Sequence, residues 1–311
     1  MKDRHLRFCV SLTGIEDGGL HVGNLMVLLT NVALARRYGY GLLVRYGWQW
    51  VDYFKYWGGR LPGLNVLRDN LDYFDIREDI LVDEAIRLPH YIEDCLALSN
   101  MGLLEQDESV KIEANFDAYL AEYLPGLDPH CDFVDWLLDT YRRLGITSPL
   151  FVPYRNGLYP DRCQGILRTT ATDGTILYCG VREAACNVLD DLCYDIAAVV
   201  RGLDIGTTYL PLEYALYWRL GRNPPLSCHL PEIRSRGEKM SKQSGNANGY
   251  RLLDLRERFD ADDLARHLVG LCMDIPADLN TFADVCQHIE WAWLKPLAHI
   301  DIEETVFACQ S

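Results

Sequence analysis

The chain has 311 residues, of which 49% are hydrophobic and 24% are charged. This length predicts about two domains of ~150 residues, with a core that needs neither disulfides nor metal. The composition excludes collagen, coiled coils and wholesale disorder. No apolar run approaches the roughly 18 residues of a membrane span, and the N-terminal run is too short for a signal peptide. We therefore expect a cytoplasmic protein without membrane contact.

The charge is strongly negative, because 30 basic residues oppose 45 acidic ones and leave a net −15. An acidic chain repels polyanions, so any contact with nucleic acid has to be local. The 11 cysteines include no CxxC pair and no tight cluster. In a chain without a secretory leader, this usage indicates buried thiols rather than a zinc site.

The first elements predict an α/β fold. Residues 6–12 are β-rich, and residues 25–37 carry apolar side chains around nearly every face of a helix that ends at Gly39. A second strand is predicted at 41–46. A strand, a glycine-rich loop, a helix and a strand open a doubly wound parallel sheet.

The rest of the chain divides by composition. We predict helices over 65–105, strands at 175–181 and 195–202, a helix at 208–220, a strand at 226–233, and helices after 248. The stretch 106–170 is acidic and then proline-rich, which is typical of an insertion. The expected units are 1–105 and 171–247 as halves of a catalytic domain, 106–170 as an inserted subdomain, and 248–311 as a helical C-terminal region.

The first motif is GGLHVGNL, from Gly18 to Leu25, in the loop before the first helix. Backbone N–H groups and the helix dipole at such a position favour a triphosphate, and the imidazole can donate to a phosphate oxygen. The alternative is a loop glycine beside a helix cap, which is the better interpretation of this motif on its own.

The second motif is RGEKMSKQSGN, from Arg236 to Asn246. Two lysines three residues apart, between glycines, indicate a mobile cationic loop that can close over pyrophosphate. A solvated basic turn is the alternative, and the motif alone does not separate the two interpretations.

Together these motifs resemble the HIGH and KMSKS signatures of class I aminoacyl-tRNA synthetases, in the same order along the chain. Five further segments resemble glutamyl-tRNA synthetases: LRFCVSLTG (6–14), ALARRYGYGLLVR (33–45), DEAIRLPHYIEDCLALSNMGLL (83–104), NVLDDLCYDIAAVVRGLD (187–204) and PPLSCHLPEI (224–233). The resemblance implies the Rossmann-like doubly wound parallel sheet of that family, with an inserted acceptor-side subdomain and a short helical C-terminal region.

The short C-terminal region suggests a branch of the family. Long glutamyl-tRNA synthetases continue after the lysine loop into an anticodon-binding region, whereas this sequence ends soon after Asn246. KMSKQ and the tryptophan-containing segment 288–297 are similar to the short glutamyl-queuosine tRNA(Asp) synthetases. We therefore expect no anticodon-reading domain.

The resemblance implies that the protein uses ATP, with Mg²⁺ only as the partner of ATP, to form an acyl adenylate. It implies catalytic roles for His21, Lys239 and Lys242, with Lys242 on the pyrophosphate. The ATP site it implies consists of Thr13, Gly14, His21, Gly23, Asn24, Lys239, Met240, Ser241 and Lys242. The short branch also has zinc-binding cysteines, but segment 150–168 holds only one cysteine, so no structural zinc is expected.

For the acyl substrate, the resemblance implies a pocket containing Arg7, Ser11 and Arg201. A guanidinium suits a carboxylate, so these residues predict an acidic substrate; for Arg7, a strand-edge ion pair is the alternative. Two positions depart from the family, because Gly47 aligns with the acid that meets the substrate ammonium and Arg182 aligns with a tyrosine. We therefore assign Arg182 to the pocket and hypothesise a different or more acidic carboxylic acid than glutamate.

Three other features bear on the site, and the first has two interpretations. Segment 48–57 holds six aromatics, which indicate either core packing or a stacking platform for a base. The loop 15–19 is about four residues longer than in the family, which weakens the placement of Arg7 and Ser11. Asp190 and Asp191 align with family residues that position groups beside the pocket and do not bind metal.

The leading prediction is an ATP-dependent ligase that forms a glutamyl-like adenylate and transfers it to a tRNA. A repurposed paralogue that acylates a small molecule or a carrier protein is the first alternative, and the net charge favours it over tRNA. An inactive binding or regulatory paralogue is the second, and the intact HIGH-like and KMSKS-like residues argue against it.

Overall fold

The computed structural model describes residues 4–11, 19–47, 56–59, 61–102, 104–105, 132–145, 166–170, 176–203, 210, 213–214, 216–240 and 249–302. In chain order its elements are β1 (His5–Ser11), α1 (Val22–Tyr38), β2 (Gly41–Gly47), α3 (Gly63–Tyr73), β3 (Ile80–Asp83), α4 (Glu84–Asn100), β4 (Leu104–Glu105), α6 (Asp132–Leu144), β5 (Ile166–Thr170), β6 (Ile176–Gly180), α7 (Val181–Cys193), β7 (Ile196–Gly202), β8 (Leu226–Leu230), β9 (Glu232–Ser235), β10 (Glu238–Lys239), α9 (Leu252–Leu255), α10 (Ala261–Cys272), α11 (Phe282–His288), the 3₁₀ turn η1 (Trp291–Trp293) and β11 (His299–Asp301).

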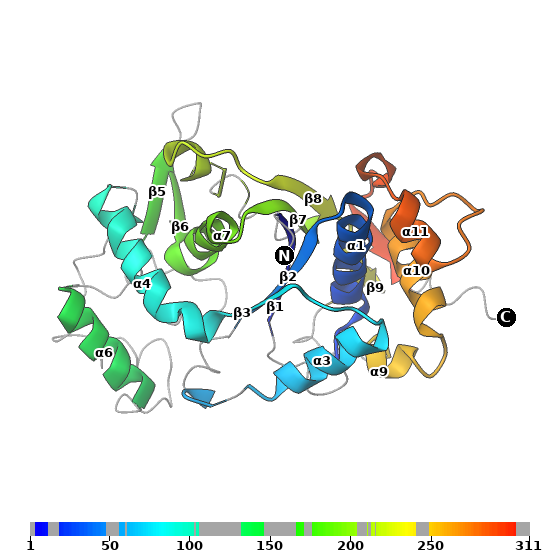
Figure 1. The fold of residues 1–311 in the computed structure, drawn as a ribbon, viewed down its shortest axis with the longest axis horizontal. Helices are drawn as coiled ribbons and strands as arrows, with labels where there is room; N and C mark the ends of the chain where they lie inside the picture. The colour runs from blue at the N-terminus through cyan, green and yellow to red at the C-terminus, as the bar shows by residue number, and fades with distance from the viewer. Residues whose placement is uncertain are drawn as a thin grey trace.

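The centre of the molecule is a five-stranded parallel sheet in the order β3-β2-β1-β7-β8 (Figure 1). The predicted α/β fold with a doubly wound parallel sheet is thus confirmed. Strand β1 lies between β2 and β7, so the chain leaves β1 toward one edge of the sheet and returns on its other side. In sheets of this kind, ligands bind where the order reverses, beyond the carboxyl ends of the strands.

The two faces of the sheet differ in chemistry. Residues alternate between faces along a strand, and the register pairs Cys9 with Arg45 and Arg7 with Val199, two residues before Arg201. The three arginines therefore share one face. The opposite face belongs to the hydrophobic core, through residues such as Phe8 and Val200.

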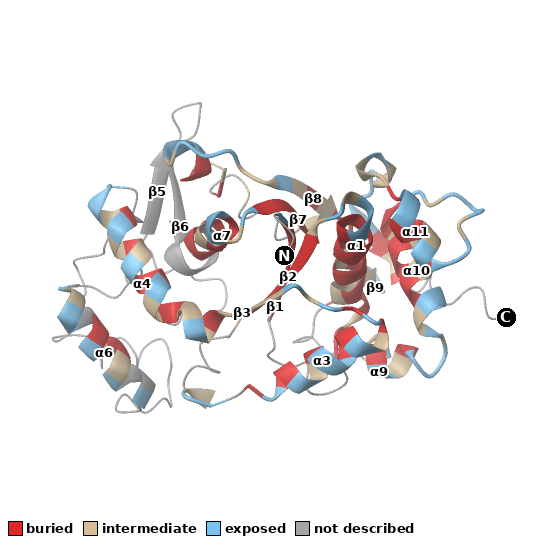
Figure 2. Cartoon of the chain, in the orientation of Figure 1, coloured by how far each residue is buried: buried red, intermediate tan, exposed pale blue. Residues whose placement is uncertain are grey.

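Helix α1 packs on the apolar face and is buried around most of its circumference (Figure 2). On its other side it contacts α10 and α11, where Thr30 lies within hydrogen-bonding distance of Cys272. Because protein covers both sides, the helix needs apolar residues on nearly every face, as its sequence predicts. It ends at Gly39 in the left-handed conformation.

Three predicted regions differ from the structure. The segment predicted as helical over 65–105 also contains β3, whose four residues are too few to break a helical pattern. Strand β6 pairs antiparallel with β5 instead of joining the parallel sheet. The C-terminal region, predicted to be helical, also contains a strand, β11, which pairs with β9. Short strands of this kind are defined by their partners more than by their own sequence.

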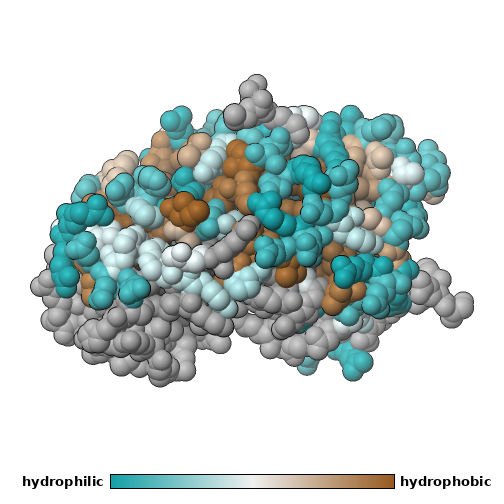
Figure 3. Space-filling model, turned by 60° about the horizontal axis from the view of Figure 1, so that its bottom comes forward, coloured by the Kyte–Doolittle hydropathy of each residue, from teal (hydrophilic) through white to brown (hydrophobic). Residues whose placement is uncertain are grey.

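The small sheet β4-β5-β6 brings together the two ends of the predicted insertion, because Leu104 pairs with Leu167. No helix in the described part of the chain is both long and apolar enough to cross a bilayer. On the face shown in Figure 3, hydrophilic side chains cover much of the described surface, and hydrophobic residues lie in separate groups.

The chain is held in place just before α1 by a buried amide. Oδ1 of Asn70 in α3 accepts the backbone N–H of Leu20 at 2.7 Å, while its Nδ2 donates to the carbonyl of Val66 at 2.7 Å. Gly19 lies against this amide with a φ of 85°, and a Cβ there would come within 2.6 Å of Oδ1. The contact leaves room for glycine alone.

We predict that Asn70→Ala lowers the free energy of unfolding by about 1–3 kcal/mol, because it leaves a buried N–H without an acceptor. Urea denaturation measures the change. The matched control is Asn280→Ala, which removes an exposed amide that donates to the carbonyl of Asp278; a change below about 0.5 kcal/mol is expected there. Equal losses in the two variants would contradict the role assigned to Asn70.

Candidate functional site

A cavity of about 250 Å³ lies beyond the carboxyl ends of β1 and β7. Segments far apart in the chain line it, and it brings together seven of the residues singled out in the sequence: Arg7, His21, Gly23, Asn24, Arg201, Lys239 and Met240. The remaining lining residues are Phe8, Cys9, Met26, Val27, Asn187, Val199, Val200, Gly202, Pro231, Glu232 and Ile233.

His21 caps the N-terminus of α1. Its Nδ1 accepts the backbone N–H of Gly23 at 3.1 Å, so in the neutral ring this geometry places the proton on Nε2, which is then a donor. A Cβ on Gly23 would lie 3.0 Å from Cε1 of His21. The glycine therefore lets the imidazole fold over the first turn. An imidazole donor beside a helix N-terminus favours an anion.

The segment after the lysine loop is attached to the start of α1. His21 and Arg251 form an antiparallel bridge. The backbone N–H of Val22 donates to the carbonyl of Tyr250 at 2.9 Å, and that of Leu252 donates to Leu20 at 2.9 Å. The two motifs, which the sequence separates by more than 200 residues, are therefore parts of one structure.

The predicted lysine loop begins as a hairpin. Arg236 and Gly237 both have positive φ, 53° and 76°, as a two-residue turn between β9 and β10 requires. Lys239 is on β10 and lines the cavity. Met240 is buried, and its N–H donates to the carbonyl of Ile233 at 2.9 Å. The stretch predicted to be mobile thus starts as a strand up to Lys239.

For several predicted site residues the structure gives no side-chain position. Thr13, Gly14, Ser241 and Lys242 lie outside the described residues. Ser11 is the last residue of β1, in register with Gly47, and Arg182 is in the first turn of α7. Their predicted roles remain predictions.

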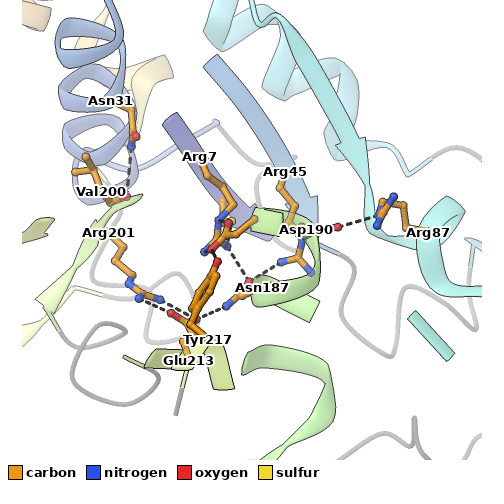
Figure 4. A network of polar contacts seen from close by, with 12 residues as sticks. Arg7, Asn31, Arg45, Arg87, Asn187, Asp190, Val200, Arg201, Glu213 and Tyr217 are labelled. Carbon is orange, nitrogen blue, oxygen red and sulfur yellow. Dashed lines mark hydrogen bonds and ion pairs between the residues drawn. The ribbon is translucent and has the colours of Figure 1, made fainter. Parts of the chain in front are cut away.

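Arg7 is buried and engaged by protein groups (Figure 4). Its Nε lies 2.7 Å from Oδ1 of Asp191, and its Nη2 donates to Oδ2 of the same carboxylate at 3.3 Å. Its Nη1 donates to Oδ1 of Asn187 at 2.8 Å and to Sγ of Cys9 at 3.0 Å. Tyr217 donates to Asp191 at 3.0 Å. The ion pair considered as the alternative for Arg7 is present, but it is buried.

Arg201 is paired with a carboxylate that the sequence motifs did not include. Its Nη1 and Nη2 donate to Oε1 and Oε2 of Glu213 at 3.1 and 2.6 Å. Oε1 also accepts from Nδ2 of Asn187 at 2.8 Å. Glu213 is 3% exposed and Arg201 is 8% exposed, so this bidentate ion pair is shielded from solvent.

Asp190 joins two more arginines on the same face. Its Oδ2 lies 2.8 Å from Nε of Arg45, and its Oδ1 lies 2.8 Å from Nε of Arg87. Tyr91 donates to Oδ2 at 2.6 Å. Asp190 and Asp191 therefore position arginines beside the cavity; among the described residues, no group of three or more His, Cys, Asp or Glu side chains is placed to hold a metal.

The acid missing at position 47 has a counterpart from another element. A Cβ on Gly47 would lie 2.8 Å from Oε2 of Glu84, at the start of α4. Glu84 is buried, and its Oε1 lies 3.8 Å from Nη2 of Arg45. The carboxylate of Glu84 thus occupies the space beside the glycine.

Burial sets the proton affinities of these acids. It raises the pKa of Asp191 to about 6, although the charge of Arg7 acts in the opposite direction. Burial alone would also raise the pKa of Glu213, but hydrogen bonds and charge from Arg201, together with Arg7 and Asn187, hold that pKa below its ordinary value. Burial therefore dominates at Asp191, whereas the interactions with Arg201 dominate at Glu213.

Sequence reasoning missed Asn187 and Glu213. Asn187 lines the cavity and bridges Arg7, Arg45 and Glu213. Its position at the start of the matched segment NVLDD was the available signal. Glu213 lies in a stretch predicted only as a helix, and nothing in its local pattern distinguishes it from a solvated acid.

Two other predictions fall mostly outside the described residues. Of the aromatic segment 48–57, the structure describes Tyr56 and Trp57, and the ring of Trp57 lies 4.7 Å from that of Trp136. This contact agrees with packing for that one ring. Of segment 150–168, where zinc ligands were judged missing, only 166–168 are described.

No family profile matches the chain. It is 24% identical over 281 residues to glutamate–tRNA ligase 2 of Rickettsia canadensis, a match that covers 83% of this chain and 58% of the relative. It is 25% identical over 257 residues to glutamate–tRNA ligase 1 of Rickettsia prowazekii, covering 77% and 54%. The chain thus spans little more than half the length of these relatives.

Solved structures show the same fold. A glutamate–tRNA ligase of Elizabethkingia meningosepticum, in complex with its amino acid, matches 96% of this chain and 67% of its own with a TM-score of 0.62 and 14% identity. A glutamate–tRNA synthetase of Elizabethkingia anophelis matches 98% and 69% with a TM-score of 0.61 and 14% identity. The fold is that of class I synthetases, and the sequence similarity to glutamate–tRNA ligases supports a relationship to that class without distinguishing its branches.

Proposed function

We propose that the protein is an ATP-dependent ligase that activates a carboxylic acid as an acyl adenylate. The observation that carries the proposal is the single cavity at the switch point of the sheet. There, seven residues chosen from the sequence meet, although they come from four separate segments of the chain. An arrangement of this kind is unexpected if the motifs were an ordinary helix cap and a solvated turn.

The residues of the cavity have different roles in this proposal. The N-terminus of α1 and Nε2 of His21 favour the phosphates of ATP, and Gly23 keeps the imidazole close to the helix. Lys239, carried on the hairpin, supplies positive charge for the pyrophosphate that leaves when the acid's carboxylate attacks the α-phosphate. The remaining task is to align the two reactants, which needs no general base.

Mg²⁺ belongs to this proposal as the partner of ATP. Among the described lining residues, the carboxylate is that of Glu232, and it accepts from Nε of Arg234 at 2.9 Å. This donor set fits an ion held mainly by the phosphates, as Mg²⁺ often is. When bound, it would neutralise phosphate charge.

For the acceptor we propose a tRNA, as in the short glutamyl-queuosine tRNA(Asp) synthetases that the sequence resembles. A small molecule or a carrier protein is the second candidate, and the net charge of −15 favours it, since an acidic surface repels a polyanion.

We predict that His21→Ala and Lys239→Ala each reduce ATP–pyrophosphate exchange by about 10²–10³-fold, because each removes a group that stabilises phosphate charge. Exchange is measured with a panel of carboxylic acids. The matched control for the first variant is His288→Ala, an exposed histidine on α11, which should retain wild-type exchange. Absence of exchange with every acid in the wild-type protein would instead support an inactive paralogue.

The acceptor is identified by incubating the protein with ATP, the acid that supports exchange, and either total tRNA or a small-molecule extract. We expect label in acid-precipitable RNA that is lost after ribonuclease treatment. Label confined to a small molecule or to protein would overturn the tRNA proposal and leave adenylation intact. The His21→Ala protein serves as the control for non-enzymatic labelling.

A further inference from the structure

The arginines beside the cavity are matched by buried carboxylates. Four arginines meet four acids on this face of the sheet, in contacts of 2.6–3.8 Å: Arg7, Arg45, Arg87 and Arg201 with Glu84, Asp190, Asp191 and Glu213. The charges of these eight described side chains therefore balance. This balance bears on which acid the cavity accepts, and the argument below rests on the proposed adenylation.

One part of the cavity, at His21 and the start of α1, favours phosphate groups. The other part has to hold the side chain of the acid. The acid's reacting carboxylate has to reach the phosphates at His21 and the start of α1. Apart from Lys239, the other polar lining residues among those described are Cys9, Asn24, Glu232, Arg7, Asn187 and Arg201. We place the rest of the acid beside the last three, which belong to the charged cluster. Their free hydrogen-bonding capacity decides which side chain fits.

Both arginines already have a carboxylate or other protein acceptors at contact distance. The side edge of Arg7 faces Asp191, and its remaining nitrogen donates to Asn187 and Cys9. The end of the Arg201 guanidinium is occupied by both oxygens of Glu213. A free carboxylate placed here would add an unmatched negative charge to a buried site, which is strongly unfavourable.

An uncharged polar group fits the same place. Arg201 lines the cavity, and its buried Nε has no hydrogen-bond partner among the described residues. A carbonyl or hydroxyl oxygen that the side chain shifts to meet would accept from this guanidinium without added charge. A buried N–H group without an acceptor is unfavourable, so a ligand oxygen that accepts from it is stabilised.

We infer that the activated acid carries an uncharged polar side chain, and that Glu213 selects it by cancelling the charge of Arg201. This differs from the acidic substrate expected from the sequence, because Glu213 lies outside every motif that led to that expectation. Glu213 is a specificity-determining residue that acts through Arg201 and has no direct contact with the cavity.

The test compares pairs of acids that are nearly identical in shape but differ in charge: glutamate with glutamine, and aspartate with asparagine. ATP–pyrophosphate exchange yields kcat/KM for each. For the wild-type protein we expect the amide to be preferred by at least tenfold in the better pair. A preference for the charged acid would overturn this inference while leaving adenylation standing, and absence of exchange with all acids would overturn both.

The variant Glu213→Gln keeps an oxygen for Arg201 but removes the cancelling charge. We expect this variant to raise kcat/KM for the charged acid, relative to kcat/KM for the uncharged acid, by at least tenfold. The matched control is Glu290→Gln. This acid binds Arg37 and Tyr38 at the C-terminal end of α1, whereas the cavity lies at the N-terminal end. The control should leave this ratio of kcat/KM values unchanged.

A purely structural role for Glu213 would lower exchange with all acids equally and would keep the ratio, and that result would overturn the inference. If circular dichroism shows that Glu213→Gln does not fold, the inference is tested by the wild-type protein alone, through its kcat/KM values for the charged and the uncharged acid of each pair.

Discussion

The ion pair between Arg7 and Asp191 links the central strand of the sheet to α7, and the arrangement around the cavity depends on it. A guanidinium in the middle of a sheet is tolerated only with a counter-charge at contact distance. With Asp190, which contacts Arg45 and Arg87, it fixes where α7 lies relative to β1, β2 and α4. Removal of one partner would leave the other charge buried and unmatched.

The two faces of the sheet serve different purposes because their side chains differ. On the apolar face, α1 is enclosed by the core, which holds its N-terminus and His21 at the edge of the cavity. On the polar face, hydrogen-bonded charges set the electrostatics of the same cavity. Apolar packing tolerates exchange of one side chain for another of similar volume, whereas the matched charges are specific to each pair. Selectivity for a substrate is therefore expected to reside on the polar face.

The sequence predicts the fold where local patterns are strong. The enclosed helix α1 and the strands β1, β2 and β7 follow from apolar runs. His21 and Lys239, from the two motifs, line one cavity. The sequence does not predict β3, because four residues next to a helix are too few to show the apolar–polar alternation of a strand. Nor does it predict Glu84 or Glu213, since an acid that becomes buried by meeting an arginine from a distant segment has the same local signature as a solvated one.

The matched charges also alter how the net charge of −15 is to be interpreted. The eight described side chains of the cluster balance in charge, so they do not account for the excess of acids. One of the basic residues that follow β8 is engaged as well, because Nε of Arg234 donates to Glu232. A tRNA would need several unengaged cations along its backbone, whereas ATP needs only the helix N-terminus and a few donors. For the proposed ligase, the charges of the described residues thus bear on the acceptor more than on the adenylation step.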